Sequence, residues 1–320
     1  MDLSALLTNL TAPPTLFFFL GILATLVRSD LEIPQPVARF LSLYLLMSIG
    51  LKGGMELAHS GLGLSVLTIM GAAVGMAVLV PLASFGLLRR FFPGPDAAAL
   101  AATYGSISAV TFVTAAAFLD SVGVAYGGYM VAAMALMESP AIIVGVMLHQ
   151  RQENNGKGAE WGLLLRDAFL NGSVVLILGS LLIGLASADR VEVQLGPFID
   201  DIFKGLLCFF LLDMGLVAAK RIGVVRTYGK AVLGFAVGIP VVSGLLSVGV
   251  AWVLGFSPGD AVLFALLGGS ASYIAVPAAM RLAVPEANPS LYIPMSLGLT
   301  FPFNVILGIP MYYSLVTLIW

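Results

Sequence analysis

The sequence predicts an all-α integral membrane protein with ten transmembrane helices, arranged as two inverted five-helix repeats. Of the 320 residues, 59% are hydrophobic and 10% are charged, whereas soluble proteins carry roughly 25% charged residues. At roughly 20 apolar residues per span, this length holds about ten helices. In addition, a short Gly-Ser-x-Ser motif occurs twice, each time inside an apolar run.

Long apolar runs separated by short polar connections place the spans. The first five are predicted at about 12–28, 38–58, 62–88, 96–119 and 123–149, and the second five at about 164–187, 198–219, 229–254, 259–282 and 289–318. The hydrophilic stretch 150–163 is predicted as a linker between a first repeat, residues 1–149, and a second repeat, residues 164–320. Because five spans is an odd number, the two repeats must have opposite topologies.

The repeated motif predicts a break in the fourth and in the ninth helix. A shift of 164 positions places Gly105-Ser-Ile-Ser108 on Gly269-Ser-Ala-Ser272, with seven identities over the twenty positions from 96 to 115. Backbone breaks at membrane depth are tolerated only where they line a cavity or are buried in protein. Matching breaks in two halves indicate the substrate site of a transporter.

After each break a second half-helix begins, and its free amide groups carry a partial positive charge. Such helix starts bind anions, and inverted repeats bring two of them together. The residues predicted to bind a small anion, the substrate, are Gly105, Ser106, Ser108, Gly269, Ser270, Ala271 and Ser272. The alternative is that these small residues only allow close helix packing. Asp96 and Asp260, which precede the two apolar runs, are interpreted as structural N-caps.

A coupled cation needs oxygen ligands, which broken helices and nearby hydroxyl or carboxylate groups supply. The predicted Na⁺ ligands are Ser108, Thr111, Thr114, Glu138, Ser139, Ser272, Ser296, Thr300 and Asn304. Glu138 is the strongest candidate because an intramembrane carboxylate is usually functional. It is interpreted as a cation ligand or proton carrier, with a protonated structural glutamate as the alternative. Asp213 is a weaker candidate of the same kind.

Lysine and arginine in the connections predict the orientation. With the N-terminus outside, Arg190 is the one basic residue in the outer connections. The inner connections then carry Arg28, Arg39, Arg89, Arg90, Arg151, Lys157, Arg166, Lys220, Arg221, Arg226, Lys230 and Arg281. We therefore expect a multi-pass protein of the plasma (inner) membrane, with both termini outside and a cytoplasmic linker. Lys52, four residues before Glu56, and Lys204 are interpreted as snorkelling or locally paired lysines.

These features resemble the cyanobacterial sodium-dependent bicarbonate transporter (SbtA) family over the whole chain. The most specific strings are Ala-Leu-Met-Glu138-Ser-Pro-Ala and Phe-Leu-Leu-Asp213-Met-Gly-Leu. The resemblance implies Na⁺/HCO₃⁻ symport in a carbon-concentrating mechanism, with Na⁺ as coupling ion. It also implies a homotrimer whose core domains (spans 3–5 and 8–10) move by an elevator mechanism past gate domains (spans 1, 2, 6 and 7). A cytoplasmic PII-like regulatory protein is implied as a partner, although the linker is short.

The sequence thus predicts a sodium-coupled bicarbonate symporter of the lipid bilayer, with no organic cofactor and no nucleic-acid partner. The alternatives are a cation/proton antiporter using Glu138 and Asp213, a sodium symporter for another small organic anion, and a passive anion channel. The wider architecture also resembles bile-acid sodium symporters, so the fold alone does not name the substrate. An enzyme is not expected, because the sequence has no G-x-S-x-G or H-E-x-x-H motif.

Overall fold

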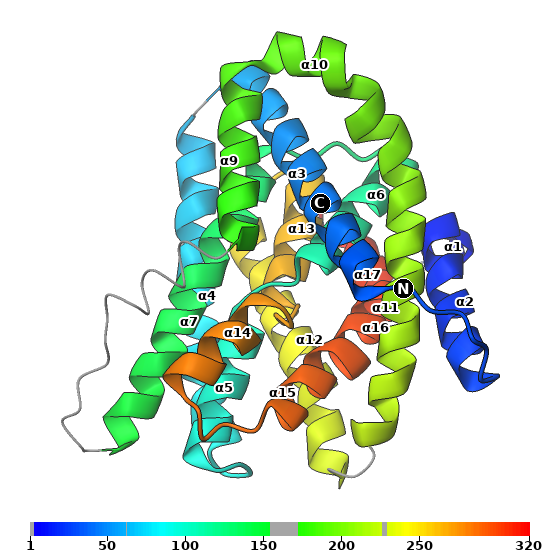
Figure 1. The fold of residues 1–320 in the computed structure, drawn as a ribbon. Helices are drawn as coiled ribbons and strands as arrows, with labels where there is room; N and C mark the ends of the chain where they lie inside the picture. The colour runs from blue at the N-terminus through cyan, green and yellow to red at the C-terminus, as the bar shows by residue number, and fades with distance from the viewer. Residues whose placement is uncertain (1–2, 62, 154–171, 226–228) are drawn as a thin grey trace.

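The computed structural model describes residues 3–61, 63–153, 172–225 and 229–320 (Figure 1). The helices, with π-helical segments labelled η, are α1 (Leu3–Thr11), α2 (Pro13–Leu26), α3 (Gln35–Ser60), α4 (Leu64–Leu88), α5 (Gly94–Gly105), α6 (Ala109–Ser121), α7 (Tyr129–Glu153), α9 (Gly172–Ala186), α10 (Ala188–Gly196), η1 (Pro197–Asp201), α11 (Ile202–Val225), α12 (Gly229–Val253), α13 (Pro258–Gly268), α14 (Ala275–Ala283), α15 (Pro289–Met295), η3 (Ser296–Thr300), α16 (Phe301–Phe303), η4 (Asn304–Gly308) and α17 (Ile309–Ile319).

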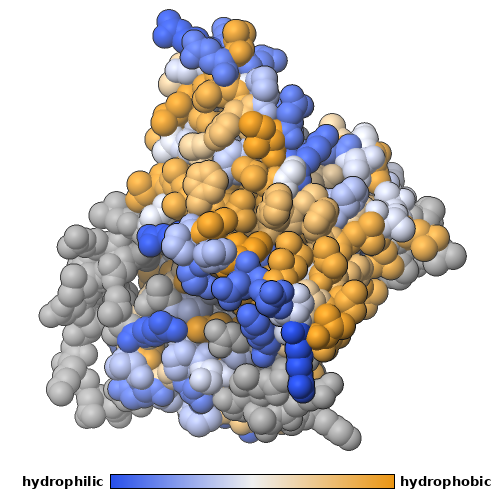
Figure 2. All heavy atoms as spheres, turned by 45° about the vertical axis from the view of Figure 1, so that its right-hand side comes forward, coloured by the Kyte–Doolittle hydropathy of each residue, from blue (hydrophilic) through white to orange (hydrophobic). Residues whose placement is uncertain are grey.

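Seven helical stretches among the described residues are long and apolar enough to cross a bilayer. They are Gln35–His59, Leu64–Leu88, Gly94–Ser121, Tyr129–Arg151, Ala188–Lys220, Val232–Val253 and Pro289–Ile319. Figure 2 shows a broad hydrophobic region across the middle of one face, with hydrophilic atoms gathered at the upper tip and towards the lower end. The chain is therefore an all-α, multi-pass membrane protein. The full set of ten spans stays a prediction.

Two short helices were not anticipated from the sequence. α1 precedes the first predicted span, and α10 occupies what the sequence predicts as an outer connection. α10 is amphipathic, with Asp189, Arg190 and Glu192 towards its start, and it continues through η1 into α11. The predicted linker from residue 154 onwards and the first part of the sixth predicted span, up to residue 171, lie outside the described residues.

The predicted interruptions of the fourth and ninth helices are confirmed. α5 ends at Gly105 and α6 begins at Ala109, whereas α13 ends at Gly268 and α14 begins only at Ala275. The second interruption is longer than the motif, because non-helical backbone continues through Ile274. Each repeated motif therefore marks where a helix stops, but only the first motif covers the full length of its gap.

Glycines bring two pairs of helices into backbone contact. At the crossings of α2 with α11 and of α3 with α9, a Cβ added to Gly21, Gly215, Gly54 or Gly184 would lie 2.1–2.3 Å from a backbone carbonyl oxygen of the other helix. Apolar side chains gain little from association in lipid, so close packing of this kind drives it. These contacts join α2 to α11 and α3 to α9.

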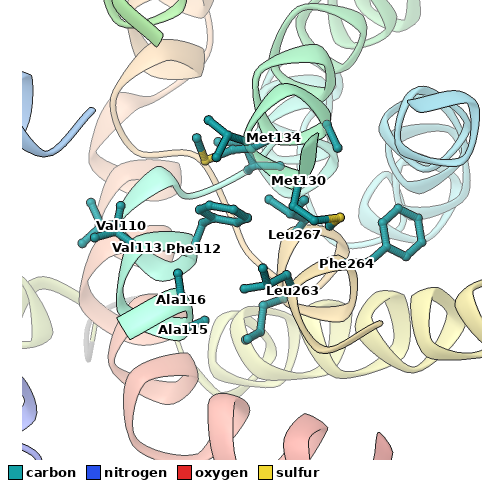
Figure 3. Packing of buried hydrophobic residues seen from close by; sticks show 14 of the residues in the cluster. Val110, Phe112, Val113, Ala115, Ala116, Met130, Met134, Leu263, Phe264 and Leu267 are labelled. Atoms are coloured by element: carbon teal, nitrogen blue, oxygen red, sulfur yellow. The ribbon is translucent and has the colours of Figure 1, made fainter. Parts of the chain in front are cut away.

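A hydrophobic core holds α6, α7 and α13 together next to the interruptions. Figure 3 shows Phe112 of α6 facing Met130 and Met134 of α7, with Leu267 of α13 close by. All four side chains are buried in one cluster. Because protein interiors are close-packed, this cluster fixes the half-helices relative to α7.

Two glycines of α11 test the close helix crossing. Gly215→Ala should lower stability by about 1–3 kcal/mol, because the new methyl overlaps the α2 backbone. Gly205→Ala is the matched control, since an added Cβ there meets nothing within 4 Å; it should change stability by less than about 1 kcal/mol. The midpoint of thermal unfolding in detergent measures both, and equal midpoints would contradict the crossing.

Candidate functional site

The two interruptions hydrogen-bond to each other across the centre of the molecule. The amide of Ser108 donates to Oγ of Ser270 at 2.9 Å, and the amide of Ser272 donates to the carbonyl of Thr103 at 2.9 Å. The Ser270 hydroxyl in turn donates to the Leu267 carbonyl at 3.1 Å. Buried backbone groups must be paired, and here each broken helix supplies partners for the other.

Serine hydroxyls organise the start of each second half-helix. Ser108 is the N-cap of α6, and its Oγ accepts from the amide of Thr111 at 3.1 Å and from the Thr111 hydroxyl at 2.9 Å. Oγ of Ser272 accepts from the amide of Val276 in α14 at 3.4 Å. The Ser108 hydroxyl also lies 3.4 Å from the Tyr273 hydroxyl, which links the two starts directly.

A small cavity of about 30 Å³ lies beside this crossing. It is lined by Ser42, Leu45, Leu46, Ile107, Ser108, Ala109, Val110, Val113, Ala135, Glu138, Ile177, Phe210, Ser272, Tyr273 and Ile274. One wall comes from both interruptions, α6 and α7, and the opposite wall from α3, α9 and α11. By the usual requirement for a buried water, this space holds about two water-sized molecules.

Glu138 is the charged residue among those that line the cavity. It belongs to α7, two residues before the helix-internal Pro140, and is 6% exposed. A buried carboxylate is costly unless a proton, a cation or hydrogen bonds compensate it. Its place on the cavity wall makes it the residue to which a cation entering this space would be drawn.

The structure separates the predicted substrate residues into two groups. Ser108 and Ser272 line the cavity. The other five are buried at the crossing but are not among the lining residues: Gly105, Ser106, Gly269, Ser270 and Ala271.

The expectation that the amides of the motifs are free is wrong for Ser106, Ser108, Gly269 and Ser272. The amides of Ser108 and Ser272 are used at the crossing. Those of Ser106 and Gly269 donate to the Ala102 and Ala265 carbonyls, at 3.0 Å and 2.8 Å. These bonds satisfy the ends of the half-helices, which the sequence pattern does not reveal. In the first turn of α6, Ala109 and Val110 line the cavity instead.

The predicted Na⁺ ligands also divide. Ser108, Glu138 and Ser272 line the cavity, and Thr111 is bonded to Ser108. Several others donate to backbone carbonyls: Thr114 to Val110 at 2.8 Å, Ser296 to Tyr292 at 2.9 Å and Thr300 to Ala236 at 2.7 Å. Ser139 is buried in α7. The structure therefore brings the cavity-lining subset together and leaves the remainder in supporting positions.

Asn304 supports the second interruption from η4. Its side-chain amide donates to the Gly269 carbonyl at 2.9 Å, just past the end of α13. Its Oδ1 is buried without a hydrogen-bond partner among the described residues. Thr300 has a comparable place at the first interruption, where its hydroxyl lies 3.0 Å from the Tyr104 hydroxyl near the end of α5.

Some of this geometry was not predicted. Tyr273 and Phe210 line the cavity, but apolar and aromatic residues are too common in membrane spans to single them out from sequence. Asp213 is buried in α11 and is not among the lining residues. Lys52 pairs across the structure, with Asp120 and Asp200, and not along its own helix as the sequence suggested.

The N-cap interpretation of the two aspartates is wrong in detail, because the N-cap residues are Pro93 and Ser257. Asp96 and Asp260 lie in the first turns, where each accepts a hydrogen bond from a distant loop. The donors are the amide of Asn288, at 2.7 Å from Asp96, and the amide of Gly127, at 2.8 Å from Asp260. Both carboxylates are structural, as expected, but they tie loops to helices.

A multi-pass membrane protein in which two interrupted helices cross beside a small cavity, lined in part by serines and a buried glutamate, has the arrangement of a solute transporter. The family model described as the Na⁺-dependent bicarbonate transporter superfamily matches residues 13–317, so the chain belongs to that superfamily. No curated protein matches the chain. Membership confirms the resemblance seen in the sequence, makes the chain a transporter rather than an enzyme, and identifies sodium as the coupling ion of its family.

The bridging role of Ser270 can be tested by removing its hydroxyl. Ser270→Ala leaves the Ser108 amide without its partner in a buried place, which should cost about 1–3 kcal/mol of stability. Ser243→Ala is the control, because that buried hydroxyl only bonds back to its own helix, to the Ile239 carbonyl at 2.7 Å, and its removal should cost less than about 0.5 kcal/mol. Thermal unfolding midpoints distinguish the two. If Ser270→Ala lowered the unfolding midpoint no more than its control, the hydrogen bond from the Ser108 amide to Ser270 would not contribute to stability.

Proposed function

We propose that the protein is a sodium-coupled bicarbonate symporter whose substrate site is the cavity beside the crossing of the two interruptions. One observation carries the proposal: both serine-capped interruptions and the carboxylate of Glu138 meet around this one small space. Family membership indicates sodium and bicarbonate as the solutes, and the cavity is the space in which we propose that they bind.

The size and the polar groups of the cavity support a small anion. A space for about two water-sized molecules suits an ion as small as bicarbonate and excludes a larger organic anion in this conformation. The first turn of α6, at Ala109 and Val110, offers the positive end of a helix dipole to the cavity. The hydroxyls of Ser108 and Ser272 add hydrogen-bonding groups, while the other motif residues hold this arrangement in place.

Glu138 supports coupling to a cation. Two like charges 4 Å apart repel by about 4 kcal/mol at an effective dielectric constant of about 20, so bicarbonate next to an ionised Glu138 needs a compensating positive charge. Sodium between them, held by Glu138 and by oxygens around the interruptions, removes this repulsion. Each ion then raises the affinity for the other by the same factor, as linkage requires.

Two sets of contacts support the inverted repeat. Asp96 at the start of α5 bonds to the amide of Asn288 before α15, and Asp260 at the start of α13 bonds to the amide of Gly127 before α7. In the same way, the glycine crossing of α2 with α11 corresponds to that of α9 with α3. Equivalent helices of the two halves therefore make equivalent contacts, which is what ten spans in two inverted repeats require.

The position of the cavity supports elevator-type transport. Its walls come from α6 and α7 on one side and from α3, α9 and α11 on the other, which correspond to the proposed core and gate domains. Sliding of the core against the gate would carry the site across the membrane. The resemblance to the bicarbonate transporter family adds a homotrimer, a PII-like regulator and a role in carbon concentration to the proposal.

Basic residues support the proposed orientation. In Figure 1 the junction of α4 with α5 and the C-terminal end of α7 lie at the lower end, and they carry Arg89, Arg90 and Arg151. α10, at the upper end, carries the single basic residue Arg190. The lower end is thus proposed to face the cytoplasm of the cell, with both termini outside.

Uptake of labelled bicarbonate into proteoliposomes tests the function. We expect uptake with an inward sodium gradient and none with an equal potassium gradient. Uptake that is independent of sodium would contradict symport and indicate a channel or a uniporter. No uptake by a folded preparation would reject bicarbonate as substrate.

Glu138→Gln tests the cation site, because it keeps the shape of the side chain and removes the charge. The sodium concentration for half-maximal uptake should rise at least about tenfold, as a loss of about 1.4 kcal/mol implies. Glu192→Gln, on the exposed surface of α10, should leave it unchanged. Equal sodium dependence in both variants would remove Glu138 from the cation site.

A cation/proton antiporter is the second candidate, favoured by the same carboxylate on the cavity wall. An antiporter would move sodium against a proton gradient in the absence of bicarbonate, and Ser106→Ala should leave that activity intact. A bicarbonate symporter should show no such sodium flux.

A further inference from the structure

A second polar cavity, of about 40 Å³, lies along the same interface as the substrate cavity. It is lined by Ser48, Ile49, Lys52, Ala116, Ala117, Asp120, Tyr126, Ile199, Asp200, Phe203 and Lys204. On α3 the lining passes from Leu46 at the first cavity to Lys52 at the second, about 9 Å further along the helix at 1.5 Å per residue. The two cavities therefore follow one another towards the end of the molecule where α10 lies (Figure 1).

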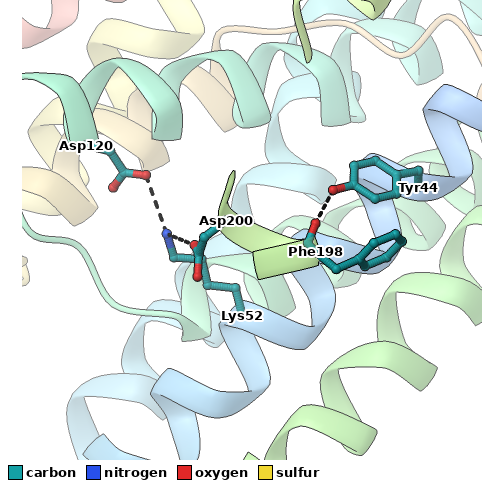
Figure 4. A network of polar contacts seen from close by, with 5 residues as sticks. All are labelled: Tyr44, Lys52, Asp120, Phe198 and Asp200. Carbon is teal, nitrogen blue, oxygen red and sulfur yellow. Dashed lines mark hydrogen bonds and ion pairs between the residues drawn. The ribbon is translucent and has the colours of Figure 1, made fainter. Parts of the chain in front are cut away.

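Lys52 joins three elements at this second cavity (Figure 4). Its Nζ lies 3.4 Å from Oδ1 of Asp200 in η1 and 3.6 Å from Oδ2 of Asp120 at the end of α6. α3 and η1 are also tied by the hydrogen bond from the Tyr44 hydroxyl to the Phe198 carbonyl. The bond to Asp200 therefore stays within one side of the interface, and the bond to Asp120 crosses it.

The backbone of α3 is also in close contact with another segment beside Lys52. A Cβ added to Gly128, in the connection before α7, would lie 2.5 Å from the Gly53 carbonyl oxygen of α3. The segment that follows α6 thus rests directly on α3 one residue after Lys52. The ion pair and this backbone contact therefore both lie where α3 meets the segment that follows α6, at the second cavity.

We propose that Lys52 is the outer gate residue of the transporter, which closes the outer route by pairing with Asp120 across the interface while Asp200 holds it on the α3 side. This inference rests on the proposed function, because it assumes that α6 moves against α3 during transport. When the outer route opens, the Lys52–Asp120 pair breaks, and Lys52 keeps Asp200 as its partner. The charge of Lys52 is then never left without a carboxylate.

Accessibility of the substrate cavity from outside tests the gate. The single cysteine, Cys208, is replaced by serine, and Ala135→Cys places a thiol on the cavity wall, about one helical turn before Glu138. The rate of labelling by an impermeant thiol reagent is measured on right-side-out vesicles. Lys52→Met and Asp120→Asn should each raise this rate about fivefold, the size expected when a partly exposed ion pair is lost.

Two further variants sharpen the result. Lys204→Met is the matched control, because Lys204 lines the same cavity and forms no ion pair with the residues that the structure describes; its labelling rate should stay unchanged. Lys52→Arg keeps a positive charge facing both Asp120 and Asp200, and it should label near the original rate. A low rate in Lys52→Arg beside a high rate in Lys52→Met assigns the faster labelling to the lost charge.

Sodium-dependent bicarbonate uptake is measured in the Cys208→Ser protein in parallel. If uptake depends on sodium but Lys52→Met and Asp120→Asn label at the original rate, the gate is refuted and the proposed function stands. If labelling rises as expected but uptake does not depend on sodium, the gate stands and the proposed function fails.

Discussion

The structure depends on one constraint, that backbone groups left open by a broken helix need partners where no water is available. The chain meets it by crossing its two interruptions. The amide of Ser108 reaches Oγ of Ser270, and the amide of Ser272 reaches the carbonyl of Thr103. Neither interruption is satisfied without the other, so the repeated motif is first a structural device. Its second role follows from the space that the crossing leaves beside it.

The cavity beside the crossing is lined by groups that attract an anion and by a carboxyl group. The bonds of the crossing use the amides that would otherwise attract an anion most strongly, and the cavity retains the first turn of α6 and the hydroxyls of two serines. Glu138 lies on the wall of the same space. In the proposed function, an anion beside an ionised Glu138 is repelled unless a cation lies between them, and each ion then favours binding of the other.

Much of this was predictable from sequence, for a clear reason. The interruptions at Gly105 and Gly269 were predictable because glycine and serine recur at matching positions in two otherwise apolar runs. Glu138 was predictable as a site residue because charged residues are rare inside membrane spans. The partners were not predictable. Ser270 is 162 residues from Ser108, and which hydroxyl or carbonyl meets a given amide depends on how the helices cross. Lys52 shows the same limit, since Glu56 is its nearest acid on the helix while Asp120 and Asp200 come from elsewhere in the fold.

The contacts also indicate which parts can move. Glycine crossings bind α2 to α11 and α3 to α9 at backbone distance, and the buried cluster around Phe112 locks α6, α7 and α13 to one another. Sliding within either group would break close packing that has no cheap substitute in lipid. Between the groups, the Lys52–Asp120 pair lies beside the close approach of Gly128 to Gly53. The paired side chains are 34% and 43% exposed, and such pairs contribute only about 1 kcal/mol or less. The ion pair therefore adds little to the cost of motion along this interface, on which the proposed substrate cavity lies.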